Sequence, residues 1–178
     1  PNNPRRLTNH PGIDCSPAYS PDGSKIVFTS SRAGKPSIHV MNANGSGVMR
    51  ISKGRYDDQA VWSPQGDIIA YCSQNSSGNF DICLIRPNGL EYTNITKGKG
   101  DNQSPDFSPD GRHLVFSSNR SGKSQLYAFH LEPEGGGKSV TVGGGTGLSS
   151  GLRELDRQEA IRLTWVPNNC TSPTWSPY

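Results

Sequence analysis

Acidic and amide side chains recur at matching places in this chain, each five to eight residues before a Ser-Pro dipeptide. Their oxygens accept hydrogen bonds and bind hard cations, and several carboxylates that face one space repel one another unless a positive group lies between them. The pattern predicts a polar binding surface for a partner. Its members are Asp14, Asp57, Asp58, Asp101, Asn102, Asn168 and Asn169. The alternative is that these residues only satisfy backbone groups in turns, where Asp and Asn are common.

The metal chemistry of this surface is not specified by the sequence. A hard cation such as calcium would suit oxygen ligands, but repeated Asp and Asn residues alone do not define a calcium site. The four cysteines, Cys15, Cys72, Cys83 and Cys170, show no CxxC spacing and no clustered histidine, which argues against zinc. We therefore expect no cofactor, and the metal ligands stay unassigned.

A glycine-rich stretch at about 135–160 contains two patterns that are typical of catalytic proteins. A glycine loop before an expected helix, Leu152 to Ala160, suits phosphate binding, but the surrounding βαβ unit is absent. Residues 147–151 spell GxSxG, but no histidine follows them, so a Ser-acid-His triad cannot be completed. We expect an exposed insertion here and no enzyme activity.

The elements that position these residues follow from a repeat anchored on Ser-Pro. The anchors Ser20, Ser63, Ser108 and Ser176 are separated by 43, 45 and 68 residues. An aromatic residue precedes each anchor, and we expect it to pack between neighbouring repeats. An alternating apolar strand follows each of the first three, then a turn with glycine, a second strand and a short last strand. Matching arginines, Arg32 and Arg120, are expected to connect adjacent repeats through a carboxylate or carbonyl.

Four short strands in about 44 residues are typical of one blade of a β-propeller. The fold class predicted is all-β, a propeller of four-stranded antiparallel blades. Within a single domain over 1–178, the repeats span about 9–52, 53–96 and 97–164, with an insertion at about 135–160, and a further blade begins at 165–178. The segment 5–8 is expected to be the outer strand of a preceding blade. About three and a half blades do not close a ring, so we expect part of a larger propeller.

The segment SPAYSPDGSKIVFTSSRAGKPSIHVMNANGSGVMRIS, with two more copies after it, resembles the WD40-like Pro-Asp repeat (PD40) of the TolB family in the Tol-Pal system. This resemblance implies a six-bladed propeller and a periplasmic, non-enzymatic scaffold. The implied partners are a peptidoglycan-associated lipoprotein and other Tol components, bound at the channel mouth. The implied role is in envelope integrity, cell division and protein transport, peripheral to the membrane.

Charge and hydropathy exclude other classes of function. The net charge of +3 is mixed along the chain, which gives no support for nucleic-acid binding, and no stretch is long and apolar enough for a transmembrane helix. An enzyme-class alternative stays open, in which this is the propeller of a prolyl-oligopeptidase-like serine peptidase that controls substrate access.

Overall fold

A computed structural model describes residues 3–131, 159–165 and 169–175 of the chain. These residues form strands and loops and contain no helix. None of the described segments is therefore a helix that could span a membrane. The strands are β1 (Asp14–Tyr19), β2 (Lys25–Ser30), β3 (Ser37–Asn42), β4 (Met49–Arg50), β5 (Asp57–Trp62), β6 (Ile69–Gln74), β7 (Phe80–Ile85), β8 (Thr93–Asn94), β9 (Asn102–Phe107), β10 (His113–Ser118), β11 (Gln125–His130) and β12 (Ile161–Arg162).

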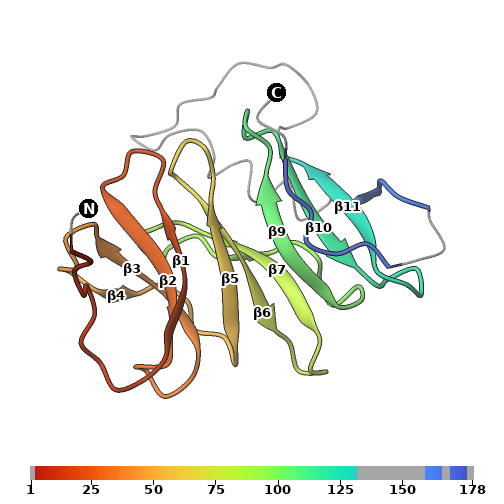
Figure 1. The fold of residues 1–178 in the computed structure, drawn as a ribbon. Coiled ribbons are helices and arrows are strands. Elements are labelled where there is room, and N and C mark those ends of the chain that lie inside the picture. Colours follow the sequence, from red (N-terminus) through yellow and green to blue (C-terminus); the bar gives the residue numbers. More distant parts are fainter. Residues whose placement is uncertain (1–2, 132–158, 166–168, 176–178) are drawn as a thin grey trace.

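The strands form three four-stranded antiparallel sheets, each ordered as in the sequence: β1 to β4, β5 to β8 and β9 to β12. The sheets stand side by side with a progressive rotation, as blades do around an axis (Figure 1). We call them the first, second and third blades. The predicted fold class, part of a β-propeller with four-stranded antiparallel blades, is confirmed.

The Ser-Pro anchor produces the turn between the first two strands of each blade. In the first blade, the Gly23 N–H donates to the Ser20 carbonyl at 2.8 Å, and Gly23 adopts a φ of 70°, which favours glycine. The side chain of Asp22 accepts hydrogen bonds from the Ser20 and Ser24 hydroxyls. The repeated sequence therefore sets the length and register of each hairpin.

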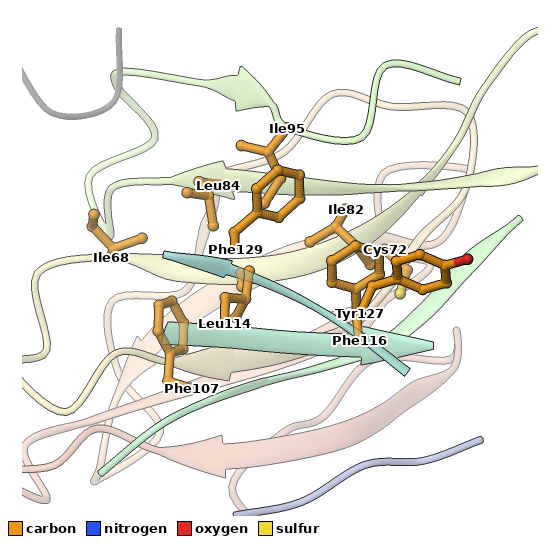
Figure 2. Packing of buried hydrophobic residues seen from close by; sticks show 11 residues of the cluster. Ile68, Cys72, Ile82, Leu84, Ile95, Phe107, Leu114, Phe116, Tyr127 and Phe129 are labelled. Atoms are coloured by element: carbon orange, nitrogen blue, oxygen red, sulfur yellow. The ribbon is translucent and has the colours of Figure 1, made fainter. Parts of the chain in front are cut away.

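The apolar core lies between the blades. One cluster combines apolar side chains of the second blade with aromatic side chains of the third, among them Leu84, Phe107 and Phe116 (Figure 2). A second cluster joins the first and second blades, and Trp62 packs against it. Each blade therefore needs its neighbour's face to bury its own apolar surface. The expected packing of the anchor aromatics between blades is seen for Trp62 and Phe107.

The segment 5–8 lies where the outer strand of a preceding blade would lie. Leu7 packs against the outer face of the first blade, and its backbone approaches Gly45 as the backbone of Ile51 approaches Gly89 in the next blade. The segment is nevertheless not a strand, contrary to the expectation. A strand needs a hydrogen-bonded neighbour, and the described chain holds no third strand of that blade.

The other end of the chain repeats this relationship on the opposite side. The indole N–H of Trp175 donates to the Asp106 carbonyl at 3.2 Å, just as the Trp62 indole donates to the Ala18 carbonyl at 3.1 Å. Residues 169–175 therefore follow β9 as the inner strand of a next blade would. The glycine-rich stretch 135–158, the GxSxG pattern, most of the expected helix and the anchor Ser176 lie outside the described residues.

Candidate channel mouth

The inner strands β1, β5 and β9 are neighbours in space, and their first residues lie at the same end of the blades as the loops that lead into them. The hairpins between the second and third strands lie at this end as well, because the strands are antiparallel. We call this end the mouth. Its described loops include 9–13, 31–36, 51–56, 75–79, 95–101 and 119–124.

Asp14, at the start of β1, forms an ion pair inside its own blade. Arg32 donates to both carboxylate oxygens of Asp14 at 3.1 Å, and the guanidinium lies over the ring of Phe28. Burial alone would raise the pKa of Asp14, but hydrogen bonds from Ser30, Thr8 and Arg32 outweigh it and the pKa is lowered. The expectation that Arg32 connects adjacent blades is wrong, since its carboxylate partner comes from the same sheet.

Asp57, at the matching position of β5, is 0% exposed and makes its contacts across a blade junction. Its carboxylate accepts hydrogen bonds from the Ser52 hydroxyl at 2.6 Å, the Gly54 N–H at 2.9 Å and the Ser73 hydroxyl at 2.7 Å. Three donors compensate a buried carboxylate for the water that it has lost. Asp57 therefore joins the outer edge of the first blade to the second.

Asn102 holds the same position in β9 and is also 0% exposed. It donates to the carbonyl of Phe80, the first residue of β7, at 2.9 Å, and it accepts from Arg120 at 2.9 Å. Arg120 therefore also makes this contact within its own blade and not with an adjacent one. The neighbouring Asp101 accepts the Phe80 N–H at 2.8 Å, and Asn169 accepts the Ser124 N–H at 3.2 Å one blade further on.

Asp58, Gln59 and Ser104 form a polar network that reaches across three blades. The Thr29 hydroxyl of the first blade donates to Asp58 at 2.7 Å, and the Gln59 side chain accepts the Ser104 N–H of the third blade at 2.8 Å. Gln59 and Ser104 have positive φ angles of 57° and 55°, at irregularities in strand pairing. Such bulges redirect side chains and are frequent at functional sites.

Sequence reasoning missed Gln59 and Ser104. A weak signal was available, because both lie four residues before an anchor serine, as do Ser16 and Ser172, and all four have positive φ. Neither glutamine nor serine indicates that conformation by its residue type.

The predicted surface residues divide by exposure. Asp57 and Asn102 are buried, Asp14, Asp58 and Asp101 are half-buried, and Asn169 is exposed, while Asn168 lies outside the described residues. Many of their polar atoms are used within and between blades. Partner contact by this set therefore stays a prediction. In the part of the chain that the structure describes, no three His, Cys, Asp or Glu side chains are grouped so that they could hold a metal ion.

The three blades and the junctions between them define the class of protein as part of a β-propeller. Residues 1–84 match the family model described as the TolB beta propeller domain. A protein TolB homolog of Chlorobium luteolum is 40% identical over 126 residues, which cover 71% of this chain and 28% of that protein. The Tol-Pal system protein TolB of Bordetella parapertussis is 30% identical over 176 residues, which cover 99% of this chain and 34% of that protein.

Solved structures agree with this assignment. A putative TolB from Agrobacterium tumefaciens shares 26% identity with a TM-score of 0.70, covering 89% of this chain and 49% of that one. A prolyl endopeptidase, at 11% identity and a TM-score of 0.52 over 69% of this chain and 21% of that one, shows the fold alone. The chain is TolB-like, a PD40 β-propeller protein, and it spans about a third of the length of the two curated relatives above.

Proposed function

We propose that this protein is a periplasmic scaffold of the Tol-Pal type that acts by binding other proteins at the channel mouth and catalyses no reaction. Its partners in this proposal are a peptidoglycan-associated lipoprotein and other Tol components, and its role is to support envelope integrity and cell division. The similarity to the TolB of Bordetella parapertussis over nearly the whole chain supports the system. The proposed role requires no cofactor.

The observation that carries the proposal is the polar network at the mouth. Thr29, Asp58, Gln59 and Ser104 come from three different blades and are held in place by hydrogen bonds. A surface that is fixed in this way before a partner arrives loses little conformational freedom on binding. Asp58 is half-buried and Gln59 is exposed, so a partner can reach both side chains.

A direct binding measurement tests the proposal. The full-length protein and a purified peptidoglycan-associated lipoprotein, without its lipid anchor, are mixed in a calorimeter. We expect saturable binding that weakens about tenfold, or about 1.4 kcal/mol, when Gln59 is replaced by Ala, because one polar contact is lost at the centre of the surface. The matched control is Gln65→Ala at the opposite end of the same blade, which should bind as the wild type does. Absence of binding by the wild-type protein would overturn the proposal.

The peptidase alternative rests on fold alone, because the prolyl endopeptidase likeness has 11% identity. It predicts a hydrolase domain elsewhere in the full-length protein and hydrolysis of a proline-containing peptide substrate. The scaffold proposal predicts no such hydrolysis. An assay with a chromogenic Gly-Pro substrate therefore separates the two.

A further inference from the structure

Exposed cations recur at equivalent positions of the mouth loops. Two of them directly follow Ser52 and Thr96, which lie two residues after the ends of β4 and β8, and two more lie two residues further on. Another pair occupies the same place in the hairpins of the first and third blades. All six side chains are exposed: Lys53 and Lys97, Arg55 and Lys99, and Lys35 and Lys123.

Four carboxylates at this end already form hydrogen bonds or ion pairs within the protein. Asp57 is buried at a blade junction, Asp14 is paired with Arg32, and Asp58 and Asp101 are half-buried in hydrogen bonds. Glu159, which lies just before β12, is exposed, and it forms an ion pair with Lys99 at 2.7 Å. Among the described residues of the mouth loops themselves, every exposed charged side chain is a cation, and the one exposed carboxylate described beside them, Glu159, neutralises Lys99.

The opposite end of the blades does not share this bias. Its turns and strand ends expose charged side chains of both signs, namely Asp22, Lys25, Glu91, Asp110 and Arg112. The asymmetry therefore does not simply follow from a net charge of +3 spread evenly over the surface. A field of one sign at one end steers an oppositely charged partner to that end.

We propose that the mouth end binds an acidic segment of a protein partner, an inference that rests on the proposed scaffold function. The cations lie on separate loops of three blades, so they present positive charge at intervals around the polar network of Asp58 and Gln59. A partner segment rich in Asp and Glu complements both the charge and its spread. A nucleic-acid ligand is less favoured, because the pI of about 8.8 is below the value above 9 that is common in such domains.

The test compares charge reversal at the two ends in the full-length protein. The mouth variant is Lys53→Glu/Lys97→Glu, and the matched control is Lys25→Glu/Arg112→Glu, which makes the same change of charge at the other end. The probe is a fluorescein-labelled peptide of alternating Glu and Gly, followed by fluorescence anisotropy. All four positions are exposed, and circular dichroism should show equal folding.

We expect the mouth variant to bind the Glu peptide about tenfold or more weakly and the control to stay near wild type, with affinity falling as salt rises. Equal affinity of the two variants would overturn the inference, as would tighter wild-type binding of single-stranded DNA than of the Glu peptide.

The lipoprotein provides a separate readout. If the wild type binds the Glu peptide at the mouth but not the lipoprotein, the inference stands and the proposed partner is wrong. If the lipoprotein binds wild type and mouth variant equally, the scaffold function stands and this inference fails.

Discussion

Asp57 and Asp81 place one buried carboxylate at each of two successive blade junctions, although they come from different strands of the second blade. Asp57, in β5, accepts from Ser52 and Gly54, and Asp81, in β7, accepts from Thr96 and Gly98. The donors are equivalent residues one repeat apart. The buried carboxylate therefore comes from β5 in one repeat and from β7 in the next, although the groups that donate to it are equivalent.

Removing either carboxylate should destabilise the protein. The variants Asp57→Asn and Asp81→Asn each put an amide N–H group opposite donors in a buried site, which we expect to cost about 2–3 kcal/mol of unfolding free energy. Urea denaturation measures this loss, with Glu159→Gln as the control, because the Glu159 side chain is 82% exposed. Losses no larger than in the control would show that the two carboxylates do not hold the junctions.

The junction tryptophans predict a second effect on stability. Replacing Trp62 by Phe removes the indole hydrogen bond to Ala18, and Trp175→Phe removes the equivalent bond to Asp106, each worth about 1 kcal/mol. Thermal unfolding should show both losses. Trp165 is 72% exposed, so Trp165→Phe should leave the melting temperature unchanged. An equal loss in all three variants would contradict the junction role.

The anchor turn predicts an unusually acidic carboxyl group. Hydrogen bonds from Ser20 and Ser24 lower the pKa of Asp22 to about 2. Because the folded-state pKa is depressed, the stabilisation is complete above the ordinary value of 3.8 and is lost as pH falls toward 2. NMR titration of the side-chain carboxyl should give this midpoint.

The control for this titration lies two repeats further on. The pKa of Asp110 is also lowered, first by the hydrogen bond from Ser108. Ser20→Ala should raise only the Asp22 midpoint, and Ser108→Ala only that of Asp110. Midpoints that do not respond to the serine substitutions would rule out this cause.

The four cysteine thiols should differ in their reactivity according to how deeply they are buried. Burial raises the pKa of Cys83 to about 12 and also raises that of Cys72, whereas Cys15 is exposed and Cys170 is half-buried. A thiol reagent should therefore modify Cys15 first in the native protein and should reach Cys72 and Cys83 only after unfolding. Mass spectrometry of digested samples identifies the modified residues, and native labelling of Cys72 or Cys83 would contradict the described packing.

The repeat made the strands and their order predictable. Alternating apolar residues after each Ser-Pro turn predicted the second and third strands of each blade. The segments MRIS, TNIT and IRLT predicted the short last strands. Both patterns are local properties of the sequence. The state of the segment 5–8 was not predictable in this way, since pairing depends on a neighbour strand.

The sequence also did not predict which of the site residues are buried and which face the mouth. Asp57 and Asp58 are adjacent in sequence, yet one is buried in a junction and the other half-buried in the mouth network. The bulge at Gln59 follows them and is not marked by residue type. Composition predicted a carboxylate-rich surface, whereas hydrogen bonds to Ser52, Thr29 and Arg32 occupy those carboxylates and leave lysines and arginines on the outside.

Amide hydrogen exchange with and without the purified lipoprotein tests the central claim most directly, because it locates the bound surface on the blades. We predict that the lipoprotein slows exchange in the mouth loops 51–56 and 95–101 and around Gln59 and Ser104, while the turns at 20–24, 63–68 and 108–112 exchange as before. Slower exchange confined to those opposite turns, or no change anywhere, would contradict a protein-binding mouth.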